Sequence, residues 1–369
     1  MITQRLAGDL LKAGIAWTVV GTGLLRLETR ARTSWRGPRV HVLAYHRVVA
    51  NRDMLDSSSP INPGLCITVS SFHRQMQQLR KYCLVLSLHQ AMQALSGELP
   101  LERDAWAITF DDGYRDVFVH AFPILRSLEL PAAVFVPTGP AESGAPLLHD
   151  RLYAVLWRAL RLNCAPAVEA VANGDAALRQ AYRMALTQSP NSAVDLLIAK
   201  LPSSRLADLT AVLEDLTGGP VPLDSDARVM APAQLRELAD AGWEIGAHTV
   251  NHMALVHEPR TQVLEELHAS RTAIEGWTQR PCRYFAYCNG LHNPSTEEAV
   301  RQAAYAGALT TFDRPNCPGA NVFRISRKCL GEGHACGPGG RFSARMSLAH
   351  LHDLFGDLHL TRPVEGTHA

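Results

Sequence analysis

The sequence has almost no net charge. Its 369 residues include 36 Lys and Arg against 35 Asp and Glu, which gives a formal charge of +1. A nucleic-acid-binding domain needs a clearly basic face, so this balance predicts no nucleic-acid partner. A substrate must therefore be captured by a local site and not by the net charge of the molecule.

The sequence also lacks paired cysteines of the kind that bind structural zinc. Its eight cysteines are scattered, and none shows the C-x-x-C spacing of such a site. Hydrophobic residues make up 47% of the chain, which is enough for a large core without disulfide bonds. We interpret the cysteines as free thiols, which favours a reducing compartment.

A long hydrophobic run is absent as well. The uncharged run Ala13–Leu25 is shorter than the ~20 residues of a membrane-spanning helix, and no convincing cleavage site follows it. Basic residues flank the run, which predicts an amphipathic helical segment over residues 1–38. Contact of residues 13–25 with a membrane surface is left open, and the expected location is cytoplasmic or membrane-associated.

Short apolar strands alternate with helical segments along most of the chain. Strands are predicted at Val40–Tyr45, Trp106–Phe110, Ala132–Val136, Trp243–Ala247, Cys282–Ala286 and Phe323–Ile325. Helices are predicted at Phe72–Lys81, Tyr114–Leu128, Pro232–Ala241, Thr261–Thr278 and Ser295–Ala306. Repeated strand–helix units form a parallel sheet with its active site at the C-terminal strand ends. We therefore expect an α/β fold that forms a distorted or incomplete β/α barrel. No glycine-rich loop follows a predicted strand, so the sequence does not support nucleotide binding.

Residues 141–230 interrupt this alternation with helical patterns alone. Apolar residues recur at helical spacing, for example at Leu152, Val155, Leu156, Leu206, Leu209 and Leu213. We predict a helical insertion within a barrel domain of residues 39–330, followed by a C-terminal extension of residues 331–369. The plain core stripes favour a structural role, although a lid or a partner surface stays open.

Two adjacent carboxylates follow one predicted strand, in the segment Thr109–Tyr114 (TFDDGY). Neighbouring carboxylates do not both ionise easily unless a cation or hydrogen-bond donors lie between them. A metal ion resolves the conflict if Asp112 binds the ion and Asp111 stays free to accept a proton. Read alone, Asp-Asp-Gly is equally typical of a solvated turn.

Two histidines four residues apart, His248 and His252, follow another predicted strand. They face the same way if this segment turns helically. With Asp112 they make a set of two histidines and one aspartate, which leaves open positions as a catalytic metal site requires. In a chain with 16 histidines such a pair also arises by chance, so the two motifs carry the prediction together.

In this combination and order, the motifs resemble those of the NodB-homology polysaccharide deacetylases, carbohydrate esterase family 4. The stretches Pro131–Val136 (PAAVFV) and Gly242–His248 (GWEIGAH) resemble the family too. The resemblance covers residues 40–140 and 231–328. It implies a NodB-type distorted barrel in which Asp111 is the catalytic base and Asp112, His248 and His252 hold a divalent metal, zinc being the first choice.

The general acid is assigned from the early segment Leu43–Val48 (LAYHRV). It resembles the Tyr-His segment of a family branch that includes poly-N-acetylglucosamine deacetylases, in which this histidine, here His46, is the acid. His350 and His352 resemble the late Leu-His segment of other members. We discount them because their segment follows the last predicted strand and has a helical pattern.

A third family motif is altered in Phe285–Gly290 (FAYCNG), where Cys288 replaces the usual proline. The resemblance assigns the backbone amide of Asn289 as the donor to the oxyanion. The arginine that orients the base in many members has no match two residues before Cys288, and Arg283 or Arg324 is the expected substitute.

The resemblance predicts a hydrolase that acts on linear amides and removes N-acetyl groups from an N-acetylglucosamine-type glycan, releasing acetate. The expected substrate is an acetylated polysaccharide or a lipid-linked glycan precursor, and protein partners are unknown. Three alternatives stay open: an O-acetyl esterase, a non-catalytic sugar-binding relative, and another hydrolase such as a phosphodiesterase. The last would need a second carboxylate-rich metal cluster, which the sequence lacks.

Overall fold

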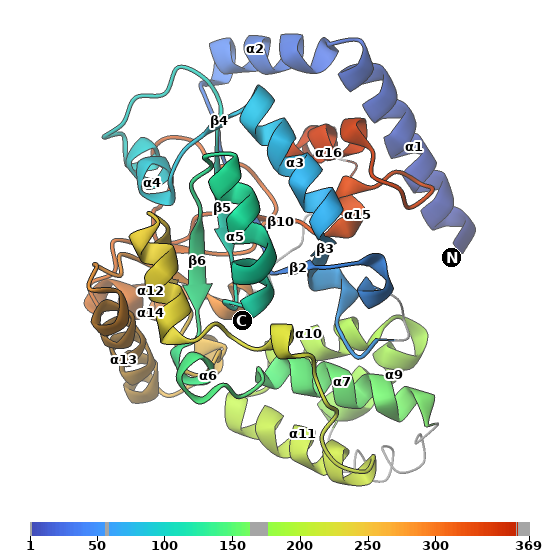
Figure 1. Cartoon of the computed structure of the whole chain (residues 1–369), viewed down its shortest axis with the longest axis vertical. Coiled ribbons are helices and arrows are strands. Elements are labelled where there is room, and N and C mark those ends of the chain that lie inside the picture. The colour runs from blue at the N-terminus through green and yellow to red at the C-terminus, as the bar shows by residue number, and fades with distance from the viewer. Residues whose placement is uncertain (1, 56–58, 163–175, 359, 361–369) are drawn as a thin grey trace.

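The computed structural model describes residues 2–55, 59–162, 176–358 and 360 of the chain. Its centre is a curled parallel sheet with strands in the order β10-β1-β5-β6-β7-β8-β9 (Figure 1). The strands and their bounds are β1 (Val40–Tyr45), β4 (Leu84–Val85), β5 (Ala105–Phe110), β6 (Ala133–Val136), β7 (Glu244–Ala247), β8 (Tyr284–Ala286), β9 (Gly307–Leu309) and β10 (Lys328–Cys329). A separate pair consists of β2 (Arg47–Val49) and β3 (Cys66–Thr68).

The sheet forms a distorted barrel. Strand β5 pairs with β1 along six residues, while β4 joins it at Ala105 and β6 joins it at Thr109. Strands β9 and β10 are not paired with each other, but Ile325 bridges to Leu309 of β9 just before β10 pairs with β1. The predicted α/β fold and distorted barrel are thus confirmed.

Helices cover the outer face of the sheet and close one end of its interior. The outer helices are α3 (Val69–Tyr82), α5 (Phe122–Ser127), α12 (Pro232–Asp240), α13 (Arg260–Thr278) and α14 (Pro294–Gln302), and α4 (Leu88–Ser96) packs against the inner face. Strand residues alternate between the two sides because successive side chains point to opposite faces. Leu43 and Ile108 pack under the outer helices, whereas Val42 and Ala107 pack with α4.

The helical insertion has its own hydrophobic core. It contains α7 (Leu148–Arg161), α9 (Ala176–Thr187), α10 (Pro190–Lys200) and α11 (Ser203–Leu216), which lie together at the bottom of Figure 1. The preceding α6 (Thr138–Ser143) packs with the barrel core through Ala141. The predicted stripes form the core of the insertion through Leu152, Leu156 and Leu209, but Leu216 is 39% exposed. The core meets the barrel at Ala254 and Leu291.

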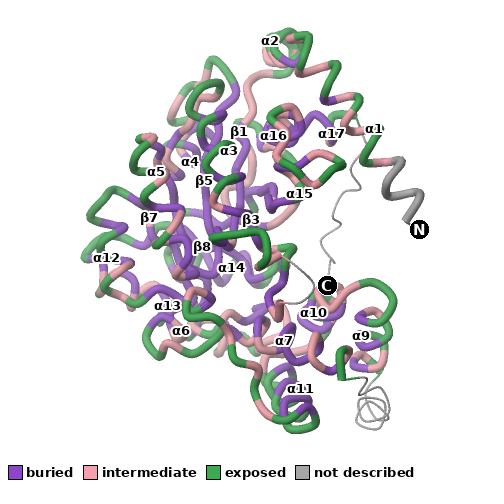
Figure 2. The backbone as a smooth tube through the Cα atoms, turned by 45° about the vertical axis from the view of Figure 1, so that its right-hand side comes forward, coloured by how far each residue is buried: buried purple, intermediate pink, exposed green. Residues whose placement is uncertain are grey.

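Helices α1 (Ile2–Gly21) and α2 (Leu24–Arg36) lie at the opposite end of the molecule, beside the C-terminal helices α15 (Glu332–Ala335), α16 (Ala344–Leu351) and α17 (Leu354–Asp357). The strands are buried, whereas α1 and α2 expose much of their surface (Figure 2). No described helix is long and apolar enough by itself to span a membrane; α1 and α2 meet the composition criterion only as a pair bent by 79°.

Several predicted elements differ from the structure. The segment predicted as one helix over residues 114–128 contains a π-helical turn, Val117–Ala121, before α5. Helix α4 and strand β9 were not predicted. The last strand is not Phe323–Ile325: only Ile325 makes a bridge there, and the paired strand is β10. Such short strands depend on neighbouring strands for pairing, which local sequence does not show.

Candidate functional site

The two carboxylates of the first motif lie at the C-terminal end of β5. Asp111 continues the inward alternation of Ala107 and Thr109, so its side chain faces the barrel interior. Asp112 adopts a left-handed conformation with φ 66°, and Gly113 follows with φ 62°. This turn directs the two neighbouring carboxylates to different partners, and both are 2% exposed.

Asp111 is held by a buried arginine. The Arg327 Nη1 and Nη2 atoms donate to the two carboxylate oxygens of Asp111, each at 2.6 Å, and Arg327 Nε donates to the Thr310 carbonyl at 2.9 Å. The prediction that Arg283 or Arg324 substitutes for the family's arginine is therefore wrong, because Arg324 lies beside Glu297. Burial would raise the pKa of Asp111, but Arg327 and His248 outweigh it and lower the pKa.

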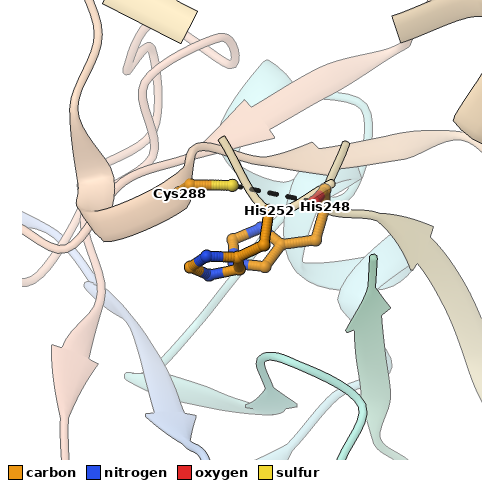
Figure 3. A group of neighbouring side chains, drawn as sticks. All are labelled: His248, His252 and Cys288. Carbon is orange, nitrogen blue, oxygen red and sulfur yellow. Dashed lines mark hydrogen bonds between the residues drawn. The ribbon is translucent and has the colours of Figure 1, made fainter. Parts of the chain in front are cut away.

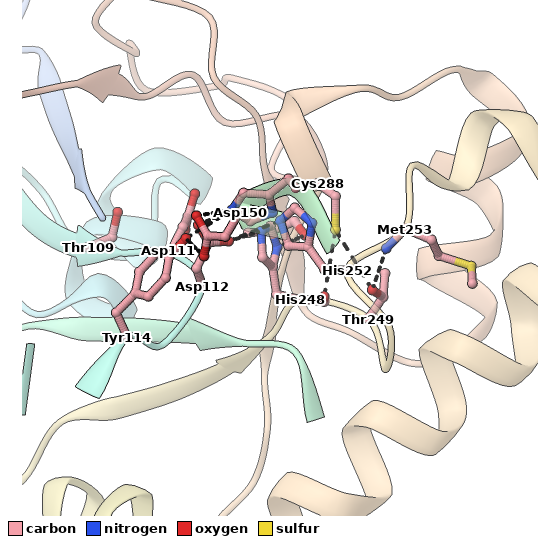
Figure 4. A network of polar contacts seen from close by, with 12 residues as sticks. Thr109, Asp111, Asp112, Tyr114, Asp150, His248, Thr249, His252, Met253 and Cys288 are labelled. Carbon is pink, nitrogen blue, oxygen red and sulfur yellow. Dashed lines mark hydrogen bonds and ion pairs between the residues drawn. The ribbon is translucent and has the colours of Figure 1, made fainter. Parts of the chain in front are cut away.

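Asp112 lies against both histidines of the second motif (Figure 4). Its Oδ1 atom is 3.0 Å from His252 Nε2 and 3.5 Å from His248 Nε2. Ligands of a tetrahedral zinc at 2.0–2.2 Å lie about 3.4 Å apart. The two distances from Asp112 therefore match the spacing of ligands around one divalent ion, and two imidazoles with a carboxylate are a donor set that fits such an ion.

The histidine pair lies on a tight turn, and both imidazoles face Asp112 although the segment is not helical. Thr249 and His252 have φ 62° and 55°, and the two imidazole centroids lie 4.8 Å apart. Glu266 accepts hydrogen bonds from the backbone amides of Val250 and Asn251 at 2.6 and 3.1 Å, which stabilises the turn.

A backbone contact orients His248 for metal binding. Its Nδ1 lies 2.7 Å from the Ala286 carbonyl, and a carbonyl only accepts hydrogen bonds, so Nδ1 carries the proton. Nε2 is therefore the ring nitrogen that faces Asp112. Ligating histidines are typically fixed in this way through the other ring nitrogen.

The electrostatics of the site favour a bound cation. Burial would raise the pKa of Asp112, but His252 and His248 hold that pKa well below its usual value. Burial would lower the pKa of His248, yet Cys288 and Asp112 raise it well above the usual value. Without a metal this cluster attracts a proton, and a divalent ion satisfies the same carboxylate and imidazoles.

Cys288 lies beside the two imidazoles (Figure 3). Its sulfur and one nitrogen of each ring lie within 4.8 Å of one another, so a His-His-Cys set is a second possible ligand group. The sulfur also lies 3.6 Å from the His248 carbonyl and 3.8 Å from Thr249 Oγ1. Burial would raise the pKa of the thiol, but His248 and His252 outweigh it and lower the pKa.

A third histidine, His149 at the start of α7, was not predicted. Its Nε2 lies 3.7 Å from Asp112 Oδ2 and 2.9 Å from the Tyr114 hydroxyl, which itself donates to Asp150 at 2.8 Å. The ring centroid lies 4.6 Å from that of His252. No sequence signal identifies His149, because it lies in the insertion and only tertiary packing brings it to β5.

All six predicted site residues line one pocket, namely His46, Asp111, Asp112, His248, His252 and Asn289. His46 follows β1, and Asn289 lies in the turn after β8 with φ 54°. The discounted late histidines lie elsewhere: His350 packs against Phe355 of the C-terminal helices, and His352 against Trp106. The pocket thus gathers residues from four strand ends on one side of the barrel.

A curled parallel barrel with a histidine–aspartate cluster at its strand ends defines an α/β protein with a candidate metal centre. The chain matches a family profile described as "Polysaccharide deacetylase" over residues 99–162 and 208–308. The poly-beta-1,6-N-acetyl-D-glucosamine N-deacetylase of Escherichia coli K12 is 36% identical over 84 residues, 21% of this chain and 12% of that protein. The chain thus matches about an eighth of the length of this curated relative.

Solved structures show the same fold. The Streptococcus pyogenes deacetylase PplD in complex with acetate aligns with TM-score 0.52 and 17% identity, covering 82% of this chain and 96% of that one. IcaB from Ammonifex degensii aligns with TM-score 0.51 and 18% identity, covering 80% and 92%. The family profile matches 165 of the 369 residues and the solved deacetylases share the fold, so the chain is similar to the polysaccharide deacetylases.

Proposed function

We propose that this protein is a metal-dependent deacetylase that removes N-acetyl groups from an N-acetylglucosamine-type glycan and releases acetate. The observation that carries the proposal is the pairing of Arg327 with Asp111 directly beside the cluster of Asp112, His248 and His252. One carboxylate is positioned as a base while its neighbour has the surroundings of a metal ligand. The E. coli relative is named for the same chemistry on poly-β-1,6-N-acetyl-D-glucosamine.

Asp112, His248 and His252 would hold the ion, with zinc the first choice for two imidazoles and a carboxylate. When bound, such an ion supplies a Lewis acid that polarises a carbonyl and lowers the pKa of water. Asp111 accepts the proton of the attacking water, and Arg327 keeps its carboxylate ionised and aimed. The Asn289 amide donates to the developing oxyanion, a contact typically worth about 3 kcal/mol, and His46 protonates the departing amine.

The test compares wild type, Asp112→Ala and Asp111→Asn, with Asp208→Asn as a matched control on the exposed side of α11. Bound metal is measured by mass spectrometry, and acetate release is measured on N-acetylglucosamine oligomers and on an O-acetylated glycan. We expect Asp112→Ala to lose metal and activity together. Asp111→Asn should keep the metal and lose activity by at least about 10²-fold.

Each contrary outcome has a definite meaning. Wild type that binds no metal under metal-replete conditions would remove the metal-dependent mechanism. Acetate release from the ester alone would reassign the protein as an O-acetyl esterase. Glycan binding without turnover of either substrate would make it a sugar-binding relative.

We also propose that helices α1 and α2 contact a membrane surface. Leu10, Leu11 and Trp17 are exposed on α1, and Leu24, Leu27 and Trp35 are exposed on α2. Residues 1–36 contain six Lys or Arg and two Asp or Glu, a charge of +4, whereas the rest of the chain carries −3. Exposed Trp and Leu flanked by arginine are typical of helices that lie in the interface of an anionic membrane.

A further inference from the structure

Two helices of the insertion form one wall of the catalytic pocket. The pocket contains about 520 Å³ of empty space, part of it open to solvent. The insertion contributes His149, Asp150, Tyr153, Asn191, Val194, Asp195 and Ile198, from α7 and α10. The favoured prediction that the insertion is only structural is therefore incomplete, because its helices shape the space that a substrate enters.

A short hydrogen-bond chain fixes this wall to the barrel. The side-chain amide of Asn62, in the loop before β3, donates to the Asn191 side-chain oxygen, and Asn191 Nδ2 donates to Asp195 Oδ2 at 3.1 Å. Asn62 is itself fixed because its Oδ1 accepts from the Gly64 amide at 3.0 Å. The carboxylate of Asp195 therefore has a defined position relative to the reacting groups.

The surface of the wall suits a sugar ring. Tyr153, Val194 and Ile198 belong to the core of the insertion and are 7%, 4% and 6% exposed, so only their edges give the pocket an apolar surface, together with Leu65. Asn62, Asn191 and Asp195 supply polar atoms. Pockets for small ligands generally combine apolar walls with a few placed polar groups. A sugar presents both an apolar C–H face and a ring of hydroxyl groups, so it can use both kinds of surface.

The charge of the pocket restricts the kind of sugar. Four carboxylates line it, those of Asp111, Asp112, Asp150 and Asp195, and none of the described lining residues is Lys or Arg. Asp111 is neutralised by Arg327, and Asp112 has the proposed metal; Asp150 and Asp195 remain on the side of the insertion. Asp150 already accepts a hydrogen bond from the Tyr114 hydroxyl, whereas Asp195 is exposed and would repel a carboxylate or phosphate on the substrate, a repulsion that salt screens in part.

We propose that α7 and α10 form the sugar-binding wall of this site, with Tyr153 packing on the sugar and Asp195 selecting neutral or amine-bearing units over acidic ones. This inference rests on the proposed deacetylase function and names its substrate class. Asp195 accepts hydrogen bonds from hydroxyl or ammonium groups of a unit beside the reacting N-acetyl group. The sugar unit beside the reacting one therefore carries no carboxylate.

The experiment uses the full chain and two probes, an N-acetylglucosamine pentamer and a hyaluronan hexasaccharide, in which acidic sugars alternate with N-acetylglucosamine. Binding is measured by calorimetry and acetate release by kinetics for wild type, Asp195→Asn, Tyr153→Ala and Tyr153→Phe. Asp208→Asn on the exposed side of α11 is the control. Circular dichroism and metal content verify that each variant is folded.

We expect wild type and Asp208→Asn to bind the neutral pentamer at least about tenfold more tightly than the acidic hexasaccharide. Asp195→Asn should reduce this ratio by about tenfold, with KM affected more than kcat because the hydrogen-bond partner of Asp195 is Asn191 and not a reacting group. Tyr153→Ala should weaken pentamer binding by about tenfold. Tyr153→Phe should retain it because the ring remains.

The outcomes separate this inference from the proposed reaction. Selective binding that depends on Asp195 and Tyr153 but yields no acetate would support the sugar-binding role of α7 and α10. It would contradict the proposed deacetylation. If acetate is released and the ratio of pentamer to hexasaccharide binding is the same in Asp195→Asn, Tyr153→Ala and the control, the proposed sugar-binding role of α7 and α10 is wrong. The proposed reaction would then still stand. A wild type that prefers the acidic probe would also overturn the wall.

Discussion

At the scale of residues, the arginine that orients Asp111 shows how strand alternation decides a role. Arg324 and Arg327 flank Ile325, which packs inside the barrel with the inner-face core. Residues two apart on an extended strand share a face, so Arg327 follows Ile325 inward, whereas Arg324 is 57% exposed. The sequence contained this signal, but the predicted strand ended at Ile325.

Replacing Arg327 should disable the base without removing the metal site. Without the guanidinium, burial raises the pKa of Asp111, so the acidic limb of the pH profile of kcat/KM should move to higher pH. We expect Arg327→Ala to lower kcat/KM by about 10²-fold or more, and Arg327→Lys to lose less because it keeps the charge but not the bidentate contact.

The matched control is Arg324→Ala, which removes an exposed arginine from the same segment. Activity is followed from pH 4 to 9, together with bound metal. If Arg327→Ala and Arg324→Ala gave the same pH profile, the positioning role of Arg327 would be wrong.

At the scale of elements, the C-terminal helices contain a buried histidine, His350, that is neutral. His350 of α16 is 6% exposed, and its ring lies 4.9 Å from that of His334 and 4.8 Å from that of Phe355. Burial, together with His334, Lys328 and Lys12, lowers the pKa of His350 to about 2. The folded chain therefore keeps this imidazole neutral at mildly acidic pH.

This burial predicts a specific acid sensitivity. Below the unfolded pKa of about 6.5, the unfolded chain binds a proton that folded His350 does not, so the free energy of unfolding falls as the pH falls. From pH 7 to pH 5 we expect a loss of about 2 kcal/mol from this group. His350→Phe should remove that part of the pH dependence, as measured by urea unfolding at both pH values.

His73→Gln, on the exposed side of α3, serves as the control and should unfold with the pH dependence of wild type. The metal-site histidines contribute equally to the pH dependence of unfolding in all three proteins. The difference in pH dependence between His350→Phe and the other two proteins therefore reports on His350 alone. An unchanged slope in His350→Phe would show that this imidazole is not held neutral.

At the scale of the whole molecule, helices α1 and α2 carry six of the thirteen exposed large hydrophobic residues in the described part of the chain. Six large hydrophobic residues of α1 and α2 are at least 48% exposed, at the opposite end of the molecule from the insertion. An apolar face of this kind marks a contact surface. The catalytic pocket lies between this surface and the insertion, at the strand ends of the barrel.

We predict that the full chain sediments with vesicles that contain anionic phosphatidylglycerol and less with phosphatidylcholine alone. Leu27→Glu combined with Trp35→Glu should weaken binding at least about tenfold, since each buried apolar side chain contributes about 1.5–3 kcal/mol. Higher salt should weaken it further. Leu186→Glu, which changes a residue 57% exposed on α9, is the control.

Equal binding by the control and the double variant would contradict this assignment. Concentration-dependent self-association of wild type, lost in the double variant and without vesicle binding, would assign the surface to a second copy of the chain. Both readings are distinguished by analytical sedimentation with and without vesicles.

The sequence by itself determined the elements whose signals are local. Alternation of strands and helices predicted the parallel barrel, and the motifs at residues 109–114 and 248–252 predicted four of the pocket residues, while His46 and Asn289 were predicted from the family resemblance of residues 43–48 and 285–290. These signals are readable because residue spacing sets which side chains share a face. The same limit applies at His248–His252, where left-handed residues make a turn that spacing does not reveal.

Only the tertiary structure decided which distant segments meet. Asp111 and Arg327 are 216 residues apart, and His149 lies in an insertion that carries only core stripes in its sequence. Sheet order, the bridge at Ile325 and the packing of α7 and α10 over the strand ends bring them together. Such contacts depend on burial and pairing between elements, and no local pattern encodes which elements become neighbours.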